Sequence, residues 1–186
     1  LAPGHPEAFW NEAMCRLLAG DYTRVVAEYE WRWRRLLRNR VSWGFEQPLW
    51  HGGDELNGKT ILLHAEQGLG DTLQFCSYVP RVTARGARVI FEVQKPLVAL
   101  MRTLSSGTEV IAKGDPLPAF DMHCPLLSLP LAFNTELDTI PGETRYLSSD
   151  AAKRDGWRAR LGPHGQPRVG LVWAGDPRKR LPNAHL

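Results

Sequence analysis

The stretch TILLHAEQGLGDTLQ, residues 60–74, decides the fold class of the chain. It opens with a short apolar run, residues 60–64, which predicts a buried β-strand. A glycine-rich loop at residues 67–70 follows, and residues 71–85 have the spacing of a helix for which Gly86 is a suitable C-terminal cap. A buried strand that leads through a short loop into a helix is the first half of a βαβ unit, from which parallel sheets are built.

The strand and helix signals continue to alternate after this unit. Residues 89–93 predict a second strand, and Pro96 opens a further helix at its first turn. Residues 109–111 and 120–124 predict two more strands. We therefore expect an α/β protein in which residues 59–162 form a Rossmann-like domain with a parallel sheet.

The last part of the sequence predicts the beginning of a second α/β domain. A helix is expected over residues 150–161, and a linker rich in Gly and Pro follows it. The run RVGLVW at residues 168–173 is typical of a buried strand. We expect residues 168–186 to be the start of a truncated C-terminal domain.

The N-terminal segment, residues 1–40, predicts a helical hairpin. Apolar side chains recur at helical spacing in residues 7–19 and again in residues 22–37, and a Gly-Asp turn separates the two stretches. Residues 41–58 lose this pattern and become rich in Ser, Gly and Pro, which indicates a linker. We expect three aromatic residues to dock the linker on the rest of the protein: Trp43, Phe45 and Trp50.

A basic run, residues 31–40, interleaves arginine with aromatic and aliphatic residues. We interpret its arginines as the solvated side of the second helix, supported by the ion pairs Glu28–Arg32 and Glu30–Arg34 at favourable spacing. The alternative is a nucleic-acid surface formed by residues 32–40. The net charge of +3 is too small to favour that alternative, so no nucleic-acid partner is expected.

Composition excludes several classes of protein. The chain has 186 residues, of which 43% are hydrophobic, and this content is too high for a disordered chain. No stretch approaches the roughly 18 apolar residues that a membrane-spanning helix needs. The three cysteines, Cys15, Cys76 and Cys124, are widely spaced, which favours a reducing, cytoplasmic location. The histidines show no metal-ligand spacing, so no metal site is expected.

Asp71 is the strongest candidate for chemistry. It follows the glycine-rich loop at the predicted carboxyl end of the first strand, where open parallel sheets bind ligands. Leu73 stands where a dinucleotide-binding fingerprint has its third glycine, and the acidic Asp71 disfavours a bound pyrophosphate. A carboxylate here can instead accept a proton from a ligand hydroxyl. The structural alternative is a helix-capping box formed by Asp71 and Gln74.

Further candidates surround this loop. The residues expected to bind substrate are His64, Glu66, Gln67, Gly68 and Gly70, and the two glycines are expected to shape the loop for a close approach to the ligand. The alternative for His64 is a packing role, because a histidine at a strand end more often packs than binds a ligand. The alternative for Glu66 is a solvent-exposed side chain with no ligand. After the last predicted strand, Arg178 and Lys179 are candidates for contacts with a donor phosphate, or else part of a solvated turn.

Four stretches carry a resemblance to a known family: YEWRW at residues 29–33, PLW at 48–50, HAEQGLGDTLQF at 64–75 and VGLVWAG at 169–175. Over nearly its whole length the chain resembles bacterial tetratricopeptide-repeat (TPR) proteins fused to a glycosyltransferase domain. That domain is similar to the heptosyltransferases of glycosyltransferase family nine. The TPR-like hairpin departs from the usual repeat, because larger residues replace small ones and its final proline is missing, so we expect a single degenerate repeat.

The resemblance implies the N-terminal half of a two-domain GT-B fold. In such enzymes the Rossmann-like domain binds a hydroxyl acceptor, the C-terminal domain binds a nucleotide sugar, and transfer is inverting and metal-independent. The resemblance assigns the role of general base to Asp71. It implies no cofactor beyond the nucleotide sugar as donor substrate, and it allows a protein partner on the TPR-like helices. The alternative is a non-catalytic interaction module, and the fragment by itself is expected to be inactive.

Overall fold

The computed structural model describes residues 5–37, 43–53, 55–104, 107–143, 145–163, 165 and 167–171. It forms two compact units, Leu1–Ser149 and Asp150–Leu186. Within the described part of the chain, no helix is long and apolar enough to cross a membrane.

The first unit is built on a four-stranded, all-parallel sheet in the order β3-β2-β1-β4. Its strands are β1 (Thr60–His64), β2 (Arg88–Val93), β3 (Thr108–Ala112) and β4 (Met122–Pro125). In the central strand, Leu62 pairs with Ile90 on one side and with His123 on the other. The prediction of an α/β, Rossmann-like parallel sheet is therefore confirmed.

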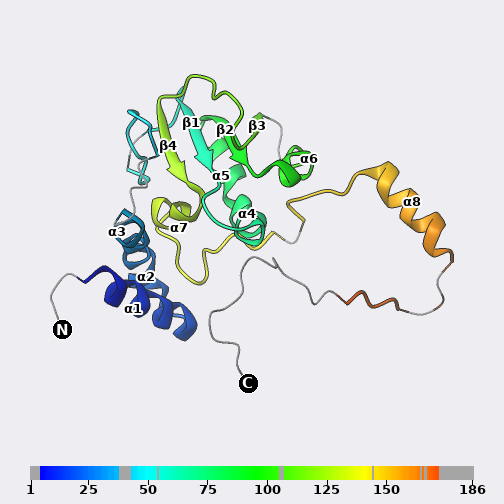
Figure 1. Cartoon of the computed structure of the whole chain (residues 1–186), viewed down its shortest axis with the longest axis horizontal. Helices are drawn as coiled ribbons and strands as arrows, with labels where there is room; N and C mark the ends of the chain where they lie inside the picture. The colour runs from blue at the N-terminus through cyan, green and yellow to red at the C-terminus, as the bar shows by residue number, and fades with distance from the viewer. Residues whose placement is uncertain are drawn as a thin grey trace. The chain divides into compact units, whose positions relative to one another are not determined.

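Short helical segments connect β1 to β2 and β2 to β3, and another pair follows β4 (Figure 1). Between β1 and β2 lie α4 (Leu69–Phe75), the 3-10 turn η1 (Cys76–Tyr78) and α5 (Val79–Thr83). Between β2 and β3 lie η2 (Lys95–Leu97) and α6 (Val98–Met101), and β4 is followed by η3 (Leu126–Ser128) and α7 (Leu129–Ala132). Both faces of the central strands are buried, as expected for a parallel sheet.

Three helices precede the sheet: α1 (Pro6–Ala19), α2 (Tyr22–Glu28) and α3 (Trp31–Leu37). The helix α1 packs on α2 and α3, and α2 contacts α7. The Phe9 and Trp31 rings stack with their centroids 4.3 Å apart, which joins α1 to α3. These helices therefore belong to the same compact unit as the sheet.

Two helices that the sequence predicts as continuous are interrupted. The prediction over residues 22–37 breaks at Tyr29 and Glu30, where the Glu30 carboxylate accepts hydrogen bonds from Arg32, Trp33 and Ser128 and so holds a turn. The prediction over residues 71–85 divides into α4, η1 and α5. Pro80 lies in the first turn of α5 and lacks the N–H that a continuous helix would need.

The segment predicted as a linker contacts the sheet closely. Leu49 forms an isolated bridge with His123, and the backbone N–H of Trp50 donates to the His123 carbonyl at 2.8 Å. The Trp50 side chain is fully buried in the main core, and the Phe45 ring lies edge-on to the His123 ring. Aromatic side chains therefore dock this segment, as expected for Trp50 and Phe45.

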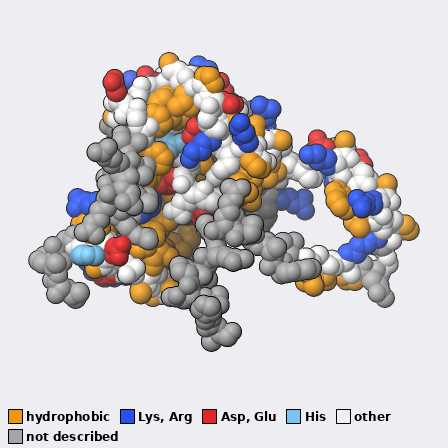
Figure 2. Space-filling view, viewed as in Figure 1, with side chains coloured by type: hydrophobic (Ala, Val, Ile, Leu, Met, Phe, Trp, Pro, Cys, Tyr) orange, Lys and Arg blue, Asp and Glu red, His pale blue; other side chains and the backbone are white. Residues whose placement is uncertain are grey.

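The second unit contains α8 (Ala151–Leu161), whose Asp150 caps the helix by accepting from the Lys153 N–H at 2.8 Å. Basic and apolar side chains are exposed around this helix (Figure 2). Residues 168–171, predicted to begin a strand, are exposed and have no regular structure. A strand needs neighbours for its backbone hydrogen bonds, and all the described strands lie in the first unit. The rest of the predicted strand lies outside the described residues.

Candidate active site

The candidate site lies at the carboxyl ends of β1 and β4. The chain passes from β1 outwards through β2 to β3 and then returns to β4 on the other side of β1, so the strand order reverses between β1 and β4. Open α/β sheets bind ligands in the crevice at such a switch point. Here the crevice is bordered by the loop 65–68 that follows β1 and by η3, which follows β4.

Asp71 lies in the first turn of α4. Its Oδ2 accepts a hydrogen bond from the Gly68 backbone N–H at 2.9 Å, so Gly68 is the N-cap residue and Asp71 caps the helix from inside. The predicted capping box of Asp71 and Gln74 is therefore wrong, because the helix begins earlier than the glycine pattern suggested. In the described part of the chain no hydrogen bond is made to Oδ1, which leaves this oxygen as an acceptor for a ligand.

Asp71 lines a cavity of about 430 Å³. This volume falls within the roughly 300–1,000 Å³ of typical small-molecule sites. Apolar side chains of α1 and α2 form one wall, and α4 and η1 form another. Four tyrosines also line it: Tyr22, Tyr29, Tyr78 and Tyr146. The cavity therefore lies between the N-terminal helices and the helical segments that follow β1, and Asp71 is part of its wall.

The predicted loop residues differ in their surroundings. Gln67 is exposed, and its Nε2 donates to the Tyr29 hydroxyl at 3.4 Å. Gly70 lies inside α4 with open space where a Cβ would be. A Cβ on Gly68 would lie 3.2 Å from the Asp71 Oδ2, and neither glycine has the positive φ that would demand glycine. Arg178 and Lys179 lie outside the described residues.

His64 is enclosed rather than open to the cavity. Its side chain is 1% exposed, its Nε2 lies 3.1 Å from the His123 Nδ1, and the Trp43 and Phe45 rings pack against it. Burial, followed by the neighbouring His123, lowers the pKa of His64 from 6.5 to about 3. The imidazole is therefore neutral at physiological pH and packs as part of the aromatic cluster.

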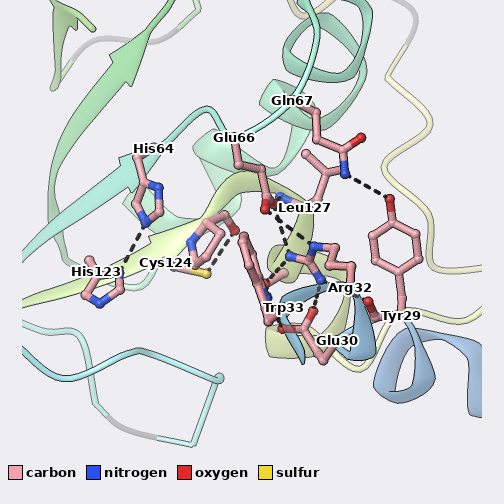
Figure 3. Close-up of polar contacts among 12 residues, drawn as sticks. Tyr29, Glu30, Arg32, Trp33, His64, Glu66, Gln67, His123, Cys124 and Leu127 are labelled. Carbon is pink, nitrogen blue, oxygen red and sulfur yellow. Dashed lines mark hydrogen bonds and ion pairs between the residues drawn. The ribbon is translucent and has the colours of Figure 1, made fainter. Parts of the chain in front are cut away.

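Glu66 is buried beside an arginine from the N-terminal helices (Figure 3). The Arg32 Nη2 lies 3.0 Å from the Glu66 Oε1 and donates to the Ser128 hydroxyl at 2.6 Å, and the Arg32 Nη1 pairs with Glu30. The Glu66 Oε1 also accepts from the Leu127 backbone N–H at 3.0 Å. Burial raises the pKa of Glu66, and the Arg32 charge opposes that rise. Arg32 therefore occupies the switch-point crevice and ties α3 to both strand ends.

The interpretation of Arg32 as part of a solvated basic face is wrong, because its side chain is 2% exposed. The predicted pair Glu28–Arg32 is also wrong: Glu28 contacts Arg16 at 3.0 Å, since the break at residues 29–30 changes the helix register. The sequence did contain a signal. Arg32 follows Tyr29 by three residues and therefore lies on the apolar stripe of the predicted helix. A buried arginine cannot contribute to the nucleic-acid surface considered for residues 32–40.

Together, the fold and the site define a Rossmann-like α/β protein whose N-terminal helices close one side of a cavity at the carboxyl edge of the sheet. No family model matches the chain, and no solved structure matches it. Protein FlbA of Caulobacter vibrioides is 25% identical in an alignment 195 residues long, and this alignment covers 92% of this chain and 33% of that protein. The chain thus spans about a third of the length of this curated relative.

Proposed function

We propose that this chain is the acceptor-side part of an inverting, metal-independent glycosyltransferase, in which Asp71 removes the proton from an acceptor hydroxyl. The observation that carries the proposal is the position of Asp71 in the wall of the cavity at the carboxyl edge of the sheet, with Oδ1 left unbonded by the described residues. The resemblance to TPR-fused glycosyltransferases similar to family nine supports it.

The reaction requires a base at this place. The acceptor oxygen attacks the anomeric carbon of the sugar, a new C–O bond forms, and the bond from that carbon to the nucleotide leaving group breaks. The acceptor proton passes to the Asp71 carboxylate, and the nucleotide leaves with the bonding electron pair. The Gly68 N–H holds Oδ2, which positions the side chain and leaves Oδ1 to take the proton of the acceptor.

The site for the nucleotide-sugar donor belongs to the predicted C-terminal domain, whose first part is residues 168–186. We propose that Arg178 and Lys179 contact the donor phosphates, because both are cations at the start of that domain. In the proposed enzyme, sugar transfer needs both the acceptor side and the donor side. All three cysteines of the chain are free thiols, which supports a reducing, cytoplasmic location.

The test replaces Asp71 with Asn in the longer protein to which we propose the chain belongs. Asparagine keeps a side-chain oxygen for the Gly68 N–H but cannot take a proton, so sugar transfer and donor hydrolysis should fall by about 100-fold or more. Nucleotide release from a panel of nucleotide sugars measures both. Asp115→Asn, the same change at an exposed carboxylate outside the cavity lining, is the matched control and should retain activity. Undiminished turnover in the Asp71→Asn protein would remove Asp71 from the mechanism.

A non-catalytic interaction module is the second candidate. On α1, Leu18 is 89% exposed and Met14 is 38% exposed, and exposed apolar side chains on one helix suit a protein partner. Absence of nucleotide release by the intact wild-type protein with every donor in the panel would favour this candidate over the enzyme.

A further inference from the structure

We propose that the cavity beside Asp71 takes an uncharged, hydroxyl-bearing molecule with an apolar face, such as a neutral glycoside, and rejects phosphorylated or carboxylated ones. The bound molecule is the acceptor of the transfer reaction only if the proposed function is correct, so the inference rests on that function. It concerns binding, however, and binding is measurable without a donor.

The charge of the cavity argues against anionic ligands. Among the described residues that line it, Asp71 is the only charged one. The nearby cations do not line the cavity: Arg32 is paired with Glu30 and Glu66, and Arg81, which donates to the Thr139 carbonyl, lies outside the lining. A phosphate or carboxylate placed in the cavity would therefore meet a carboxylate with no free cation among the described lining residues.

The hydrogen-bonding groups of the cavity include an acceptor for a ligand hydroxyl. The Tyr78 hydroxyl lies 3.0 Å from the Thr135 hydroxyl, and the Tyr146 hydroxyl donates to the Leu73 carbonyl at 3.0 Å. These hydroxyls are thus engaged by the protein. In the described part of the chain the side-chain amide of Gln74 and the Oδ1 of Asp71 make no hydrogen bond. A ligand hydroxyl can donate to Oδ1, as the proposed base requires.

The remaining surface of the cavity is apolar. Phe75, Tyr78 and Tyr146 line one side of the cavity, and side chains of α1 and α2 such as Leu17, Val25 and Val26 line another. Such walls favour a ligand with an apolar face and only a few polar groups. Because α1 and α2 supply one wall, the N-terminal helices take part in selecting the ligand.

The test compares two probes of nearly equal shape with the full chain. The probes are 4-nitrophenyl β-D-glucoside, which is neutral, and 4-nitrophenyl β-D-glucuronide, in which a carboxylate replaces the CH₂OH group. Dissociation constants from ligand-observed NMR titrations at neutral pH are expected to be about fivefold lower for the glucoside. Equal or tighter binding of the glucuronide, or failure of both probes to bind, would overturn the inference.

Two variants in the cavity and one control outside it separate the role of charge from that of shape. Asp71→Asn should bring the affinities for the two probes within about twofold of each other. Gln74→Lys places a cation one turn from Asp71 and should tighten glucuronide binding by about threefold. Leu18→Lys adds the same charge on an exposed part of α1 outside the cavity and should change neither affinity. An equal gain in glucuronide binding from Leu18→Lys would show that net charge, and not the cavity, selects the probe.

The two proposals fail independently. Loss of discrimination between the probes would contradict the acceptor class while sugar transfer by the longer protein could still depend on Asp71. Retained discrimination with no nucleotide release would contradict the enzyme while the cavity would still bind neutral hydroxyl compounds.

Discussion

The guanidinium of Arg32 lies 3.0 Å from the carboxylate of Glu66, although the two residues are 34 positions apart in the sequence. Both side chains are 2% exposed. This pair joins the N-terminal helices to the loop that also contains Gly68, the capping partner of Asp71. The position of the candidate base therefore depends on a buried contact between the two parts of the first unit.

Breaking this pair from one side should destabilise the protein strongly. Arg32→Met leaves the Glu66 and Glu30 carboxylates without their cation and should lower the free energy of unfolding by about 3 kcal/mol. Glu66→Gln removes the charge but keeps an acceptor for the Leu127 N–H, so the double variant should recover at least about 1 kcal/mol relative to the sum of the single variants. The free energies of unfolding of the two single variants and the double variant are measured by urea unfolding of the full chain, with tryptophan fluorescence as the signal. Additive effects would show that Arg32 and Glu66 are not energetically coupled.

Alanine at the two glycines of the loop should have opposite effects. At Gly68 the new Cβ would lie 3.2 Å from the Asp71 Oδ2, and alanine is a poorer N-cap residue, so Gly68→Ala should cost about 0.5–1 kcal/mol. Gly70 is helical and has open space around it, so Gly70→Ala should stabilise by about 0.5–1 kcal/mol. Thermal unfolding of the two variants distinguishes them. A change of the same sign at both positions would contradict the described start of α4.

Acid should destabilise the protein through His64. Its pKa falls from 6.5 to about 3 on folding, so between these values the unfolded chain binds a proton that the folded chain refuses. The free energy of unfolding therefore decreases as the pH falls from 6.5 towards 3, by about 1.4 kcal/mol per pH unit for this group within that window. The pKa of His123, lowered by burial and by His51, contributes in the same direction.

His64→Gln isolates the contribution of His64, because glutamine keeps a polar group near His123 but does not titrate. Urea unfolding between pH 6 and pH 4 should show a slope reduced by about 1.4 kcal/mol per pH unit relative to the wild type. Above pH 7 both proteins carry no charge at position 64, and their slopes should agree. An unchanged slope in the acid range would mean that His64 is not excluded from protonation by the fold.

The order of strands and helices could be predicted from local patterns. The strands β1 and β2 coincide with apolar runs, and Gly86 ends its helical segment with a φ of 83°, as a C-terminal cap should. Asp71 could be placed near the end of β1 because the loop is short. The hydrogen-bond partner of Asp71 could not be predicted. The Asp71 carboxylate accepts from the Gly68 N–H, and the exact start of α4 depends on how the loop packs.

The breaks in the helices and the burial of Arg32 were not predicted. The turn at Tyr29 and Glu30 is held by hydrogen bonds from Arg32, Trp33 and Ser128, and the last of these comes from η3, far along the chain. The segment after β4 was also missed as a helix, because η3 and α7 are too short for periodicity to identify.

The sequence by itself determined that this is an α/β protein with a parallel sheet and that an acidic residue follows the glycine-rich loop, because strand burial, helix spacing and turn chemistry are local properties. Only the tertiary structure decided that Arg32 and Glu66 pair out of solvent and that α1 and α2 form a wall of the cavity beside Asp71. Those contacts join residues far apart in the chain. Whether a charged side chain is solvated or buried depends on which opposite charge the folded backbone brings to it, and no local pattern contains that information.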